Sequence, residues 1–445
     1  MTIWSKHSKT WNEIKITSER VCRMNISQIM RSLYLHVWRY REIERVHRRY
    51  VEKLDRKRPV NVVFFAMSVS MWRYQHLYEL LAKDGRFNAT IVLSPSIDYT
   101  LEQQRRDVEQ MRAYFGAKGI SFVDCDVEHA ENGAFDVATE LNPDVIFYPQ
   151  PYENLLVPEH DCKHFYDKLI CYYPYAFWTS KGKWSYNFHF HNLAWRLYYS
   201  TALHLKEAQK TAQNKGRNVR VVGYANADDF LAKTHKDNWR KTDDGKQRKR
   251  LIWAPHYAIV QEFGLIQRSN FLWLAKLMVD LAERYADKLQ IAFKPHPRLL
   301  TELYRHKDWG KANTDAYYEK WETMPNTQLE TGEFVDLFMT SDAMVHDSGS
   351  FAVEYHYSQN PVMFVSKDID ALLDTQSDFG KLAYKMQYIG KNAEDVVRFV
   401  EDIVLGGSDP LKPQRKAFFN DYLLPPNGKT VAENTLDDLV ASLGI

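Results

Sequence analysis

Residues 343–355 read AMVHDSGSFAVEY, and this stretch decides the fold. The apolar run Ala343–His346 has the length of a buried strand, and the small polar residues Asp347–Ser350 form a turn before a helix that starts at Phe351. Free backbone N–H groups and the positive end of the helix dipole would then point at one spot, where phosphate binds readily. Together with the following strand, Met344–Phe364 predicts a nucleotide-type phosphate site in a parallel α/β domain.

The side chains of this turn suit a ligand. Gly349 would let a phosphate approach the backbone, and Ser348 and Ser350 can cap the helix or donate hydrogen bonds. Glu354 lies one helical turn further on, where a carboxylate could reach ribose hydroxyls. The alternative is an ordinary helix N-terminus with Asp347 in the turn.

A second strand in the same half of the chain ends in a cationic loop. The apolar run Leu289–Phe293 is followed by a segment in which two prolines prevent a helix until after Pro297. The loop therefore holds His296 at a strand end between Lys294 and Arg298. An imidazole between two cations suits binding or protonating a phosphate leaving group, although a plain surface loop remains the alternative.

Other histidines are weaker candidates. The strand-like run Leu251–Trp253 leads through Ala-Pro to His256 and Tyr257, which could face the same cleft or form a surface turn. Between residues 184 and 195, His189 and His191 alternate with aromatic residues. Either could deprotonate an acceptor hydroxyl, aromatic packing is the alternative, and the lack of a third ligand argues against a metal.

Strands alternate with helices along most of the chain, which predicts parallel sheets in two domains. In the first half, strands are expected at Val60–Phe65, Asn88–Leu93, Ile120–Val123 and Pro143–Tyr148, with helices at Met71–Lys83, Leu101–Gly116 and Asn192–Ala212. In the second half, strands are expected at Val219–Val222, Arg250–Trp253, Leu289–Phe293, Ala343–His346 and Val362–Val365, with helices at Arg268–Tyr285, Asp315–Trp321, Gly332–Met339 and Phe351–Tyr357.

These elements divide the chain into four parts. Residues 1–58 form a basic helical arm, 59–212 an N-terminal Rossmann-like acceptor domain, and 213–410 a C-terminal Rossmann-like nucleotide-donor domain. Residues 411–445 hold closing helices, and the sequence leaves open whether the last of them crosses back to the first domain.

The arm carries most of the positive charge. Met1–Arg58 has 15 Lys and Arg against 6 Asp and Glu, a net charge of +9, whereas the rest of the chain has 44 against 51, a net charge of −7. Apolar residues recur at near-helical spacing from Ile26 to Leu54. Such a helix could lie on an anionic membrane surface or could pack on the body of the protein, and both interpretations stay open.

Several classes of protein are disfavoured. The four cysteines show neither paired spacing nor a histidine partner at zinc spacing, so a reducing compartment is the simpler expectation. The sequence shows neither an apolar run long enough for a bilayer nor the apolar core of a signal peptide. The charge-rich segment Thr234–Arg250 lacks interleaved aromatics at its basic end, so we expect a solvated loop and no nucleic-acid partner. The sequence therefore predicts a cytoplasmic protein, free or peripheral on the inner face of the cell membrane.

Taken together, these segments resemble the CDP-glycerol glycerophosphotransferase family, the teichoic-acid primases and polymerases. Such enzymes have a GT-B-like fold of two facing Rossmann-like domains, and a KPHP-like loop and a D-S-S-like turn bind their donor pyrophosphate. Here the matching segments are Lys294–Pro297, Asp347–Ser350, Gln359–Phe364 and Val222–Tyr224 with Asp228. Ala225-Asn226 stand where Pro-Arg is usual, and a clear Trp-His-Gly motif, which usually supplies the acceptor-side base, is absent.

The resemblance implies transfer of a polyol phosphate, glycerol phosphate first among the candidates, from a CDP-linked donor. The acceptor would be a hydroxyl of a lipid-linked or polymeric cell-envelope glycan. Ser348, Gly349 and Ser350 would hold the pyrophosphate, Glu354 the ribose, and His189 or His191 would take the acceptor proton. Lys294, His296 and Arg298 would stabilise the departing CMP, with no metal or other cofactor.

Three alternatives remain open at this stage. A glycosyltransferase of the same fold that uses a nucleotide sugar would need a similar turn and acid. A UDP-sugar 2-epimerase has an Asp-Ser-Gly-Gly turn close to Asp347–Ser350, and a non-catalytic assembly subunit could keep the fold without the acceptor base.

Overall fold

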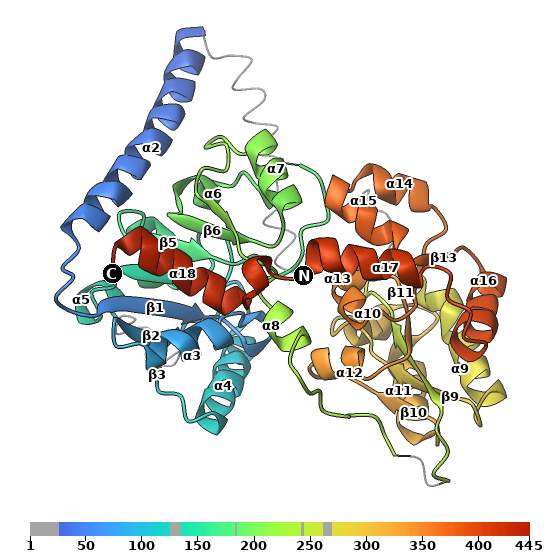
Figure 1. Ribbon diagram of the computed structural model, residues 1–445. Coiled ribbons are helices and arrows are strands. Elements are labelled where there is room, and N and C mark those ends of the chain that lie inside the picture. The colour runs from blue at the N-terminus through green and yellow to red at the C-terminus, as the bar shows by residue number, and fades with distance from the viewer. Residues whose placement is uncertain (1–25, 125–134, 183–184, 242–243, 261–268) are drawn as a thin grey trace. The chain divides into compact units, whose positions relative to one another are not determined.

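The computed structural model describes residues 26–124, 135–182, 185–241, 244–260 and 269–445, with only the backbone for residues 26–39. The chain divides into two compact units. Unit 1 comprises residues 1–175, 182–225 and 425–445, and unit 2 comprises residues 176–181 and 226–424. Each unit is built around one parallel sheet with helices packed beside it (Figure 1).

Unit 1 contains a seven-stranded sheet in the order β3-β2-β1-β4-β5-β6-β7, in which every neighbouring pair is parallel. The order reverses between β1 and β4, which makes the carboxyl ends of these strands the expected ligand edge. The strands are β1 Val60–Ala66, β2 Phe87–Leu93, β3 Phe122–Val123, β4 Val145–Tyr148, β5 Leu169–Tyr172, β6 Arg196–Tyr199 and β7 Val219–Val221. The helices are α2 Ile26–Lys53, α3 Gln75–Lys83, α4 Leu101–Ala117, α5 Val137–Glu140, α6 His189–Leu193, α7 Ala202–Thr211 and α18 Val431–Leu443.

Unit 2 contains a six-stranded sheet in the order β10-β9-β8-β11-β12-β13, again parallel throughout. Its order reverses between β8 and β11. The strands are β8 Lys249–Ala254, β9 Leu289–Phe293, β10 Thr327–Leu329, β11 Ala343–His346, β12 Val362–Val365 and β13 Tyr388–Gly390. The helices are α8 Ala227–Phe230, α9 Phe271–Arg284, α10 Leu299–Arg305, α11 Gly310–Thr323, α12 Val335–Met339, α13 Phe351–Glu354, α14 Ile369–Asp374, α15 Asp378–Lys385, α16 Ala393–Arg398 and α17 Lys412–Phe418.

Aromatic packing fixes the strands that carry the candidate site in unit 2. Trp253 on β8 is fully buried, and its ring stacks on Phe293 of β9 at 4.8 Å and on Phe271 of α9 at 5.6 Å. Trp321 of α11 closes the same cluster at 5.5 Å from Trp253. Burial of side chains this large supplies much of the unit's hydrophobic stabilisation and holds the ends of β8 and β9 in fixed positions.

The predicted fold of two Rossmann-like α/β domains is confirmed, but the short strands β5, β10 and β13 were not predicted, and one stretch was predicted as the wrong element. The expected helix Asn192–Ala212 is broken into α6, the strand β6 and α7. The β-prone residues of β6 are buried in the sheet, and Thr201 then starts α7 by accepting hydrogen bonds from two backbone N–H groups. The strand at Val219 belongs to unit 1 rather than to the second series, because it pairs with Leu197 of β6.

The last helix, α18, belongs to unit 1 with residues 425–445, whereas α17 lies in unit 2. Helix α18 packs beside α3 (Figure 1). The Tyr173 hydroxyl donates to Thr435 Oγ1 at 2.5 Å, and Asp438 Oδ2 accepts from Arg196 and from Tyr198 at 3.1 and 3.0 Å. The C-terminal helix therefore packs into unit 1, to which most of the N-terminal half of the chain also belongs.

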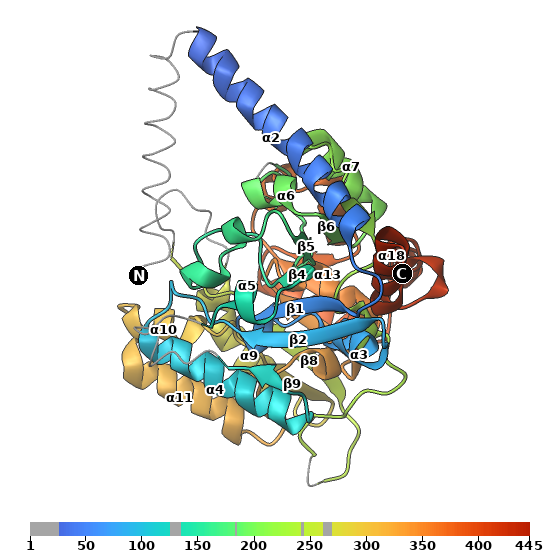
Figure 2. The same ribbon diagram turned by 90° about the vertical axis from the view of Figure 1, so that its left-hand side faces the viewer.

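The basic arm is partly a packed helix. Tyr40, His47 and Leu54 are buried at a spacing of seven residues, which places them on one stripe against unit 1. Arg58 anchors the segment after the helix through a 2.7 Å ion pair with the buried Asp144. The amino-terminal end of α2 extends beyond the sheet (Figure 2), and residues 1–25 lie outside the described part of the chain. Within that described part, none of the helices has both the length and the hydrophobicity to cross a bilayer.

Candidate functional site

Three loops meet at the carboxyl ends of β8, β9 and β11, where the strand order of unit 2 reverses. The loop after β9 is tied to the loop after β8, because the His296 N–H donates to Pro255 O at 3.1 Å. The loop after β8 is tied to the turn after β11, because the His256 N–H donates to Asp347 Oδ1 at 2.6 Å. The three sequence motifs of this half therefore form one cluster, as expected for a ligand site at a strand-order reversal.

Asp347 holds this cluster together. Its carboxylate is buried and also accepts the backbone N–H of Asn270, the residue that precedes α9. Burial raises the pKa of Asp347 to about 7, while the N–H donors of Asn270 and His256 oppose that rise. Asp347 thus ties the turn after β11 to the loop after β8 and to the start of α9.

His296 and its neighbours form the open part of the cluster. The ring of Tyr257 lies 4.5 Å from His296 and 4.3 Å from His256, and the Arg298 guanidinium stacks 4.2 Å from the same tyrosine ring. The backbone N–H of Arg298 donates to His296 Nδ1 at 3.1 Å, so the neutral imidazole carries its proton on Nε2. Burial, with Arg298 adding to it, lowers the pKa of His296 to about 4. Near neutral pH the ring is thus neutral and can donate a hydrogen bond through Nε2.

Lys294 takes a different position from the one expected. Its ammonium donates to Gly332 O at 2.7 Å and is almost fully buried. Burial lowers the pKa of Lys294, and Glu330 and Glu333 act in the opposite direction. Lys294 thus secures the loop after β10 beside the site.

The turn after β11 leaves space above Gly349. Among the described residues, a Cβ built on Gly349 would meet only the Tyr384 hydroxyl, at 4.0 Å, and its φ is not positive. The described packing and the backbone geometry therefore leave room for a ligand to approach the turn. Ser350 is exposed at the helix start and makes no capping bond with its side chain, whereas Ser348 and Glu354 are buried.

We expect Gly349→Val to abolish or strongly weaken nucleotide binding while leaving the unfolding temperature almost unchanged, because its side chain would occupy the space above the turn, where a Cβ meets no described atom closer than the Tyr384 hydroxyl at 4.0 Å. The measurement is nucleotide-induced thermal stabilisation. Gly85→Val is the matched control, since its Cβ would also meet nothing within 4 Å. Normal nucleotide binding by Gly349→Val would contradict a ligand above this turn.

Sequence reasoning missed two residues that support the turn. Asn270 bonds Asp347 and also donates through Nδ2 to Val365 O at 3.0 Å. The sequence feature that could have indicated Asn270 is its place as an amide residue directly before the apolar helix that starts at Phe271. His346 Nδ1 lies 3.0 Å from Ser348 O, and His346 Nε2 lies 2.9 Å from Gln387 Oε1. No local sequence pattern indicates these two contacts.

The two histidines proposed for the acceptor side differ sharply. His191 is fully buried, its Nδ1 accepts the Phe188 N–H at 3.1 Å, and burial lowers its pKa to about 3. This position does not let His191 touch an acceptor, so the structure argues against it as a base. Its role is to close the first turn of α6. Among the described residues, no cluster of His, Cys, Asp and Glu could hold a metal ion.

His189 remains available. Its side chain is 31% exposed, and Nδ1 lies 2.8 Å from Glu153 Oε1, which also accepts from the Tyr166 hydroxyl at 2.7 Å. The bond to His189 is the main reason why the pKa of Glu153 is lowered. The rings of Tyr166 and Tyr40 flank the imidazole at 5.7 and 6.2 Å. A carboxylate on Nδ1 leaves Nε2 as a proton acceptor, which is the arrangement of a general base.

Comparison with known proteins places this geometry in a fold class. No family model matches the chain, and no curated protein matches it. A solved structure of a variant of the wall teichoic acid polymerase TagF, soaked with CDPG, is 12% identical, with a TM-score of 0.53 over 94% of this chain and 98% of that one. The S. aureus MnaA–UDP structure is 14% identical, with a TM-score of 0.53 over 87% and 97%. The chain has a GT-B-like fold.

A third match is the UDP-GlcNAc 2-epimerase from Neisseria meningitidis bound to UDP-GlcNAc. It is 12% identical, with a TM-score of 0.50 over 86% of this chain and 100% of that chain. Identities this low show the fold alone.

Proposed function

We propose that this protein is a transferase that moves a polyol phosphate, with glycerol phosphate as the first candidate, from a CDP-linked donor. The acceptor is a hydroxyl of a cell-envelope polymer or lipid-linked glycan. The observation that carries the proposal is the cluster of His296, Arg298 and the open turn at Gly349 where the strand order of unit 2 reverses. Backbone N–H groups of a turn, a guanidinium and a neutral imidazole suit a nucleoside diphosphate.

The chemistry follows from these groups. Backbone N–H groups at Ser348–Ser350 and the Arg298 guanidinium bind the diphosphate, and the Nε2–H of His296 donates to the phosphate that leaves with the nucleotide. The acceptor oxygen forms a bond to the phosphorus that carries the polyol, and the bond from that phosphorus to the oxygen of CMP breaks. The acceptor proton passes to His189 Nε2, which Glu153 orients through Nδ1.

The choice of CDP-linked polyol rests on the sequence resemblance and on the likeness to TagF, whose structure was soaked with CDPG. A second candidate is a UDP-sugar enzyme, either a glycosyltransferase or a 2-epimerase. It is favoured by the fold likeness to the UDP-bound MnaA structure and by the Asp347–Ser350 turn. A non-catalytic subunit is disfavoured by the open His189–Glu153 pair.

A donor panel separates these functions. We expect CMP release from CDP-glycerol or CDP-ribitol in the presence of an acceptor. UDP release from a nucleotide sugar would instead show a glycosyltransferase, and interconversion of UDP-GlcNAc and UDP-ManNAc would show an epimerase. Binding of CDP-glycerol without turnover, tested with a full acceptor panel, would favour the non-catalytic subunit.

His296→Ala is expected to lower kcat by about 10²- to 10³-fold, the usual cost of losing one donor to transition-state charge. The loss should appear in kcat more than in KM, because charge builds up on the leaving phosphate only as the bond breaks. His306→Ala, at a partly buried position directly after α10, is the matched control. Unchanged turnover in His296→Ala would refute the donor mechanism.

We also propose that the arm holds the protein on the inner face of the cell membrane. Removing residues 1–39 should spare the packed stripe from Tyr40 to Leu54 and yet abolish or strongly reduce sedimentation with anionic vesicles, because the arm supplies the positive charge. Circular dichroism of the shortened chain checks that it folds. Unreduced vesicle binding by the shortened chain would contradict this role.

A further inference from the structure

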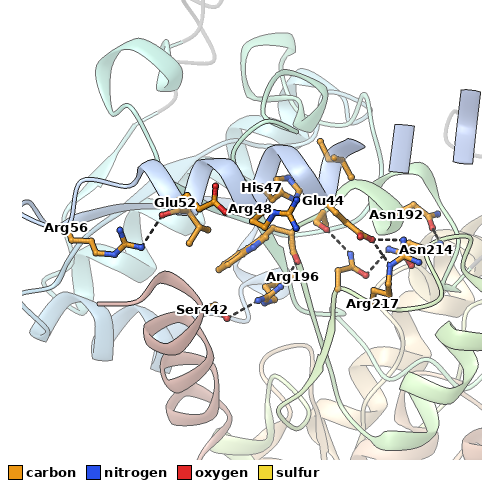
Figure 3. A pocket seen from close by; sticks show the side chains of 15 residues that line it. Glu44, His47, Arg48, Glu52, Arg56, Asn192, Arg196, Asn214, Arg217 and Ser442 are labelled. Atoms are coloured by element: carbon orange, nitrogen blue, oxygen red, sulfur yellow. Dashed lines mark hydrogen bonds and ion pairs between the residues drawn. The ribbon is translucent and has the colours of Figure 1, made fainter. Parts of the chain in front are cut away.

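Unit 1 contains a cavity of about 400 Å³ between α2 and the amino ends of β6 and β7 (Figure 3). Its lining includes residues from α2 and from the segments directly before β6 and β7, such as Trp195 and Arg217. The cavity lies at the amino ends of β6 and β7, whereas the strand-order reversal of a parallel sheet favours ligands at the carboxyl ends. It has no part in the mechanism proposed above.

The charge of the cavity favours an anion. Four arginines and two glutamates line it, giving a net charge of +2, and the four cations are Arg48, Arg56, Arg196 and Arg217. Figure 3 shows Arg217 with Glu44 at one end and Arg56 at the other. Arg196 is fixed by its 3.1 Å ion pair with Asp438, which offsets its charge, and by donating to Ser442 Oγ at 2.8 Å, and Arg56 is fixed by donating to Gly444 O at 3.2 Å.

The other two arginines are in exposed ion pairs. The Arg48 side chain is 70% exposed and lies 3.9 Å from Glu52, and Arg217 is 49% exposed and lies 2.6 Å from Glu44. Exposed pairs of this kind add little stability, so an incoming phosphate can replace either glutamate. The cavity therefore has two fixed and two movable cations.

The remaining wall is mixed. Its apolar part consists of Ile43, Val51, Ala194 and Trp195, with the Arg196 guanidinium 4.3 Å from the Trp195 ring, and its polar part consists of His47, Asn192, Asn214, Asn218 and Ser442. The apolar part of the wall would not contribute to binding an inorganic anion, whereas the glycerol and first methylene groups of a lipid would pack on it.

The surroundings of the cavity also point to a lipid. Arg41, Arg45 and Arg48 are exposed at four- and three-residue spacing, so they form a row on α2 that leads to the cavity. The same helix extends beyond the sheet of unit 1 (Figure 1). We propose that this cavity is a specific binding site for the phosphate headgroup of an anionic phospholipid.

The test uses the full chain and vesicles of phosphatidylcholine with or without phosphatidylglycerol. Wild type should sediment with the anionic vesicles, and Arg48→Glu with Arg217→Glu should weaken this binding about 10-fold or more. Arg105→Glu with Arg106→Glu on α4 changes the charge equally outside the cavity and should bind as wild type. Equal losses in the two double variants would overturn the proposal, because they would show a general charge effect.

A substitution that fills the cavity without changing its charge distinguishes lipid binding in the cavity from binding on the surface of the arm. Val51→Trp fills the cavity without changing its charge and should weaken binding as strongly as the double reversal, and Ile43→Trp is a second block should the first fail to fold. Thermal unfolding verifies that each variant is folded. Wild-type binding by a folded block variant would overturn the site. Stabilisation by free glycerol phosphate without any binding to vesicles would show a soluble phosphate ligand and would also overturn it.

Discussion

Replacing His189 with Ala is expected to lower kcat of the proposed phosphotransfer by about 10²- to 10⁴-fold, the usual contribution of a general base. The acceptor hydroxyl would then have to lose its proton to water. Nucleotide-induced stabilisation should stay at the wild-type level, because the donor groups belong to unit 2. The measurements are steady-state CMP release with acceptor present and thermal unfolding with and without nucleotide.

His164→Ala is the control for this experiment, because His164 is an exposed histidine of the same unit. It should turn over as wild type. A His189→Ala protein with normal kcat would show that the acceptor base lies elsewhere. A loss of both kcat and nucleotide stabilisation would instead point to a folding defect.

Glu153 should act through His189. Glu153→Gln keeps an oxygen that can accept a hydrogen bond from His189 Nδ1–H. It removes the negative charge that stabilises the imidazolium once the acceptor proton has reached His189. We therefore expect a smaller loss of kcat than for His189→Ala, with KM for the donor unchanged. Because the two residues act as a unit, the double variant should be no worse than His189→Ala.

The difference between His189 and His191 shows where sequence reasoning was limited. Two positions apart, both histidines alternate with aromatics and look equivalent along the chain. In the structure they lie on the helix α6, where two residues turn the side chain through roughly 200°. His191 therefore points into the core while His189 reaches Glu153, and only the helical geometry separates them.

The motifs at the strand ends were predictable because each rests on a local pattern. The apolar runs of β8, β9 and β11 have strand length, and the polar segments that follow them could only be loops. What ties those loops together was not predictable. Asp347 meets Asn270 across 77 positions of the sequence, and such a contact depends on which strands lie side by side in the sheet.

β6 was missed for a related reason. Its four residues, Arg196–Tyr199, lie between two helical segments, and a run this short does not separate strand from helix by periodicity. Arg196–Tyr199 forms a strand because it pairs with β5 on one side and with β7 on the other. The domain boundary expected at residue 213 fell too early, since the segment up to Ala225 stays with unit 1.

Asp347→Asn is expected to change the pH dependence of stability. In the unfolded chain this carboxyl titrates near 3.8, and burial raises its pKa in the folded state to about 7. The folded state therefore binds more protons between these two values, and wild type should lose stability as pH rises through this window, by a few kcal/mol for a difference of roughly three units. The Asn variant lacks this titration. Urea unfolding of both proteins at about pH 5 and about pH 8 measures the difference.

The same substitution should weaken nucleotide binding. An amide at position 347 can accept one of the two backbone N–H groups, but its own NH₂ would face the other, so the Asn270 N–H or the His256 N–H loses its partner. The turn would then no longer be held to both neighbouring loops. Asp342→Asn is the matched control, because that carboxylate accepts the Arg250 N–H at 2.9 Å just before the same strand, β11, begins. Parallel pH profiles for wild type and Asp347→Asn would refute the buried titration, whereas equal nucleotide affinity would refute the role of Asp347 in the site.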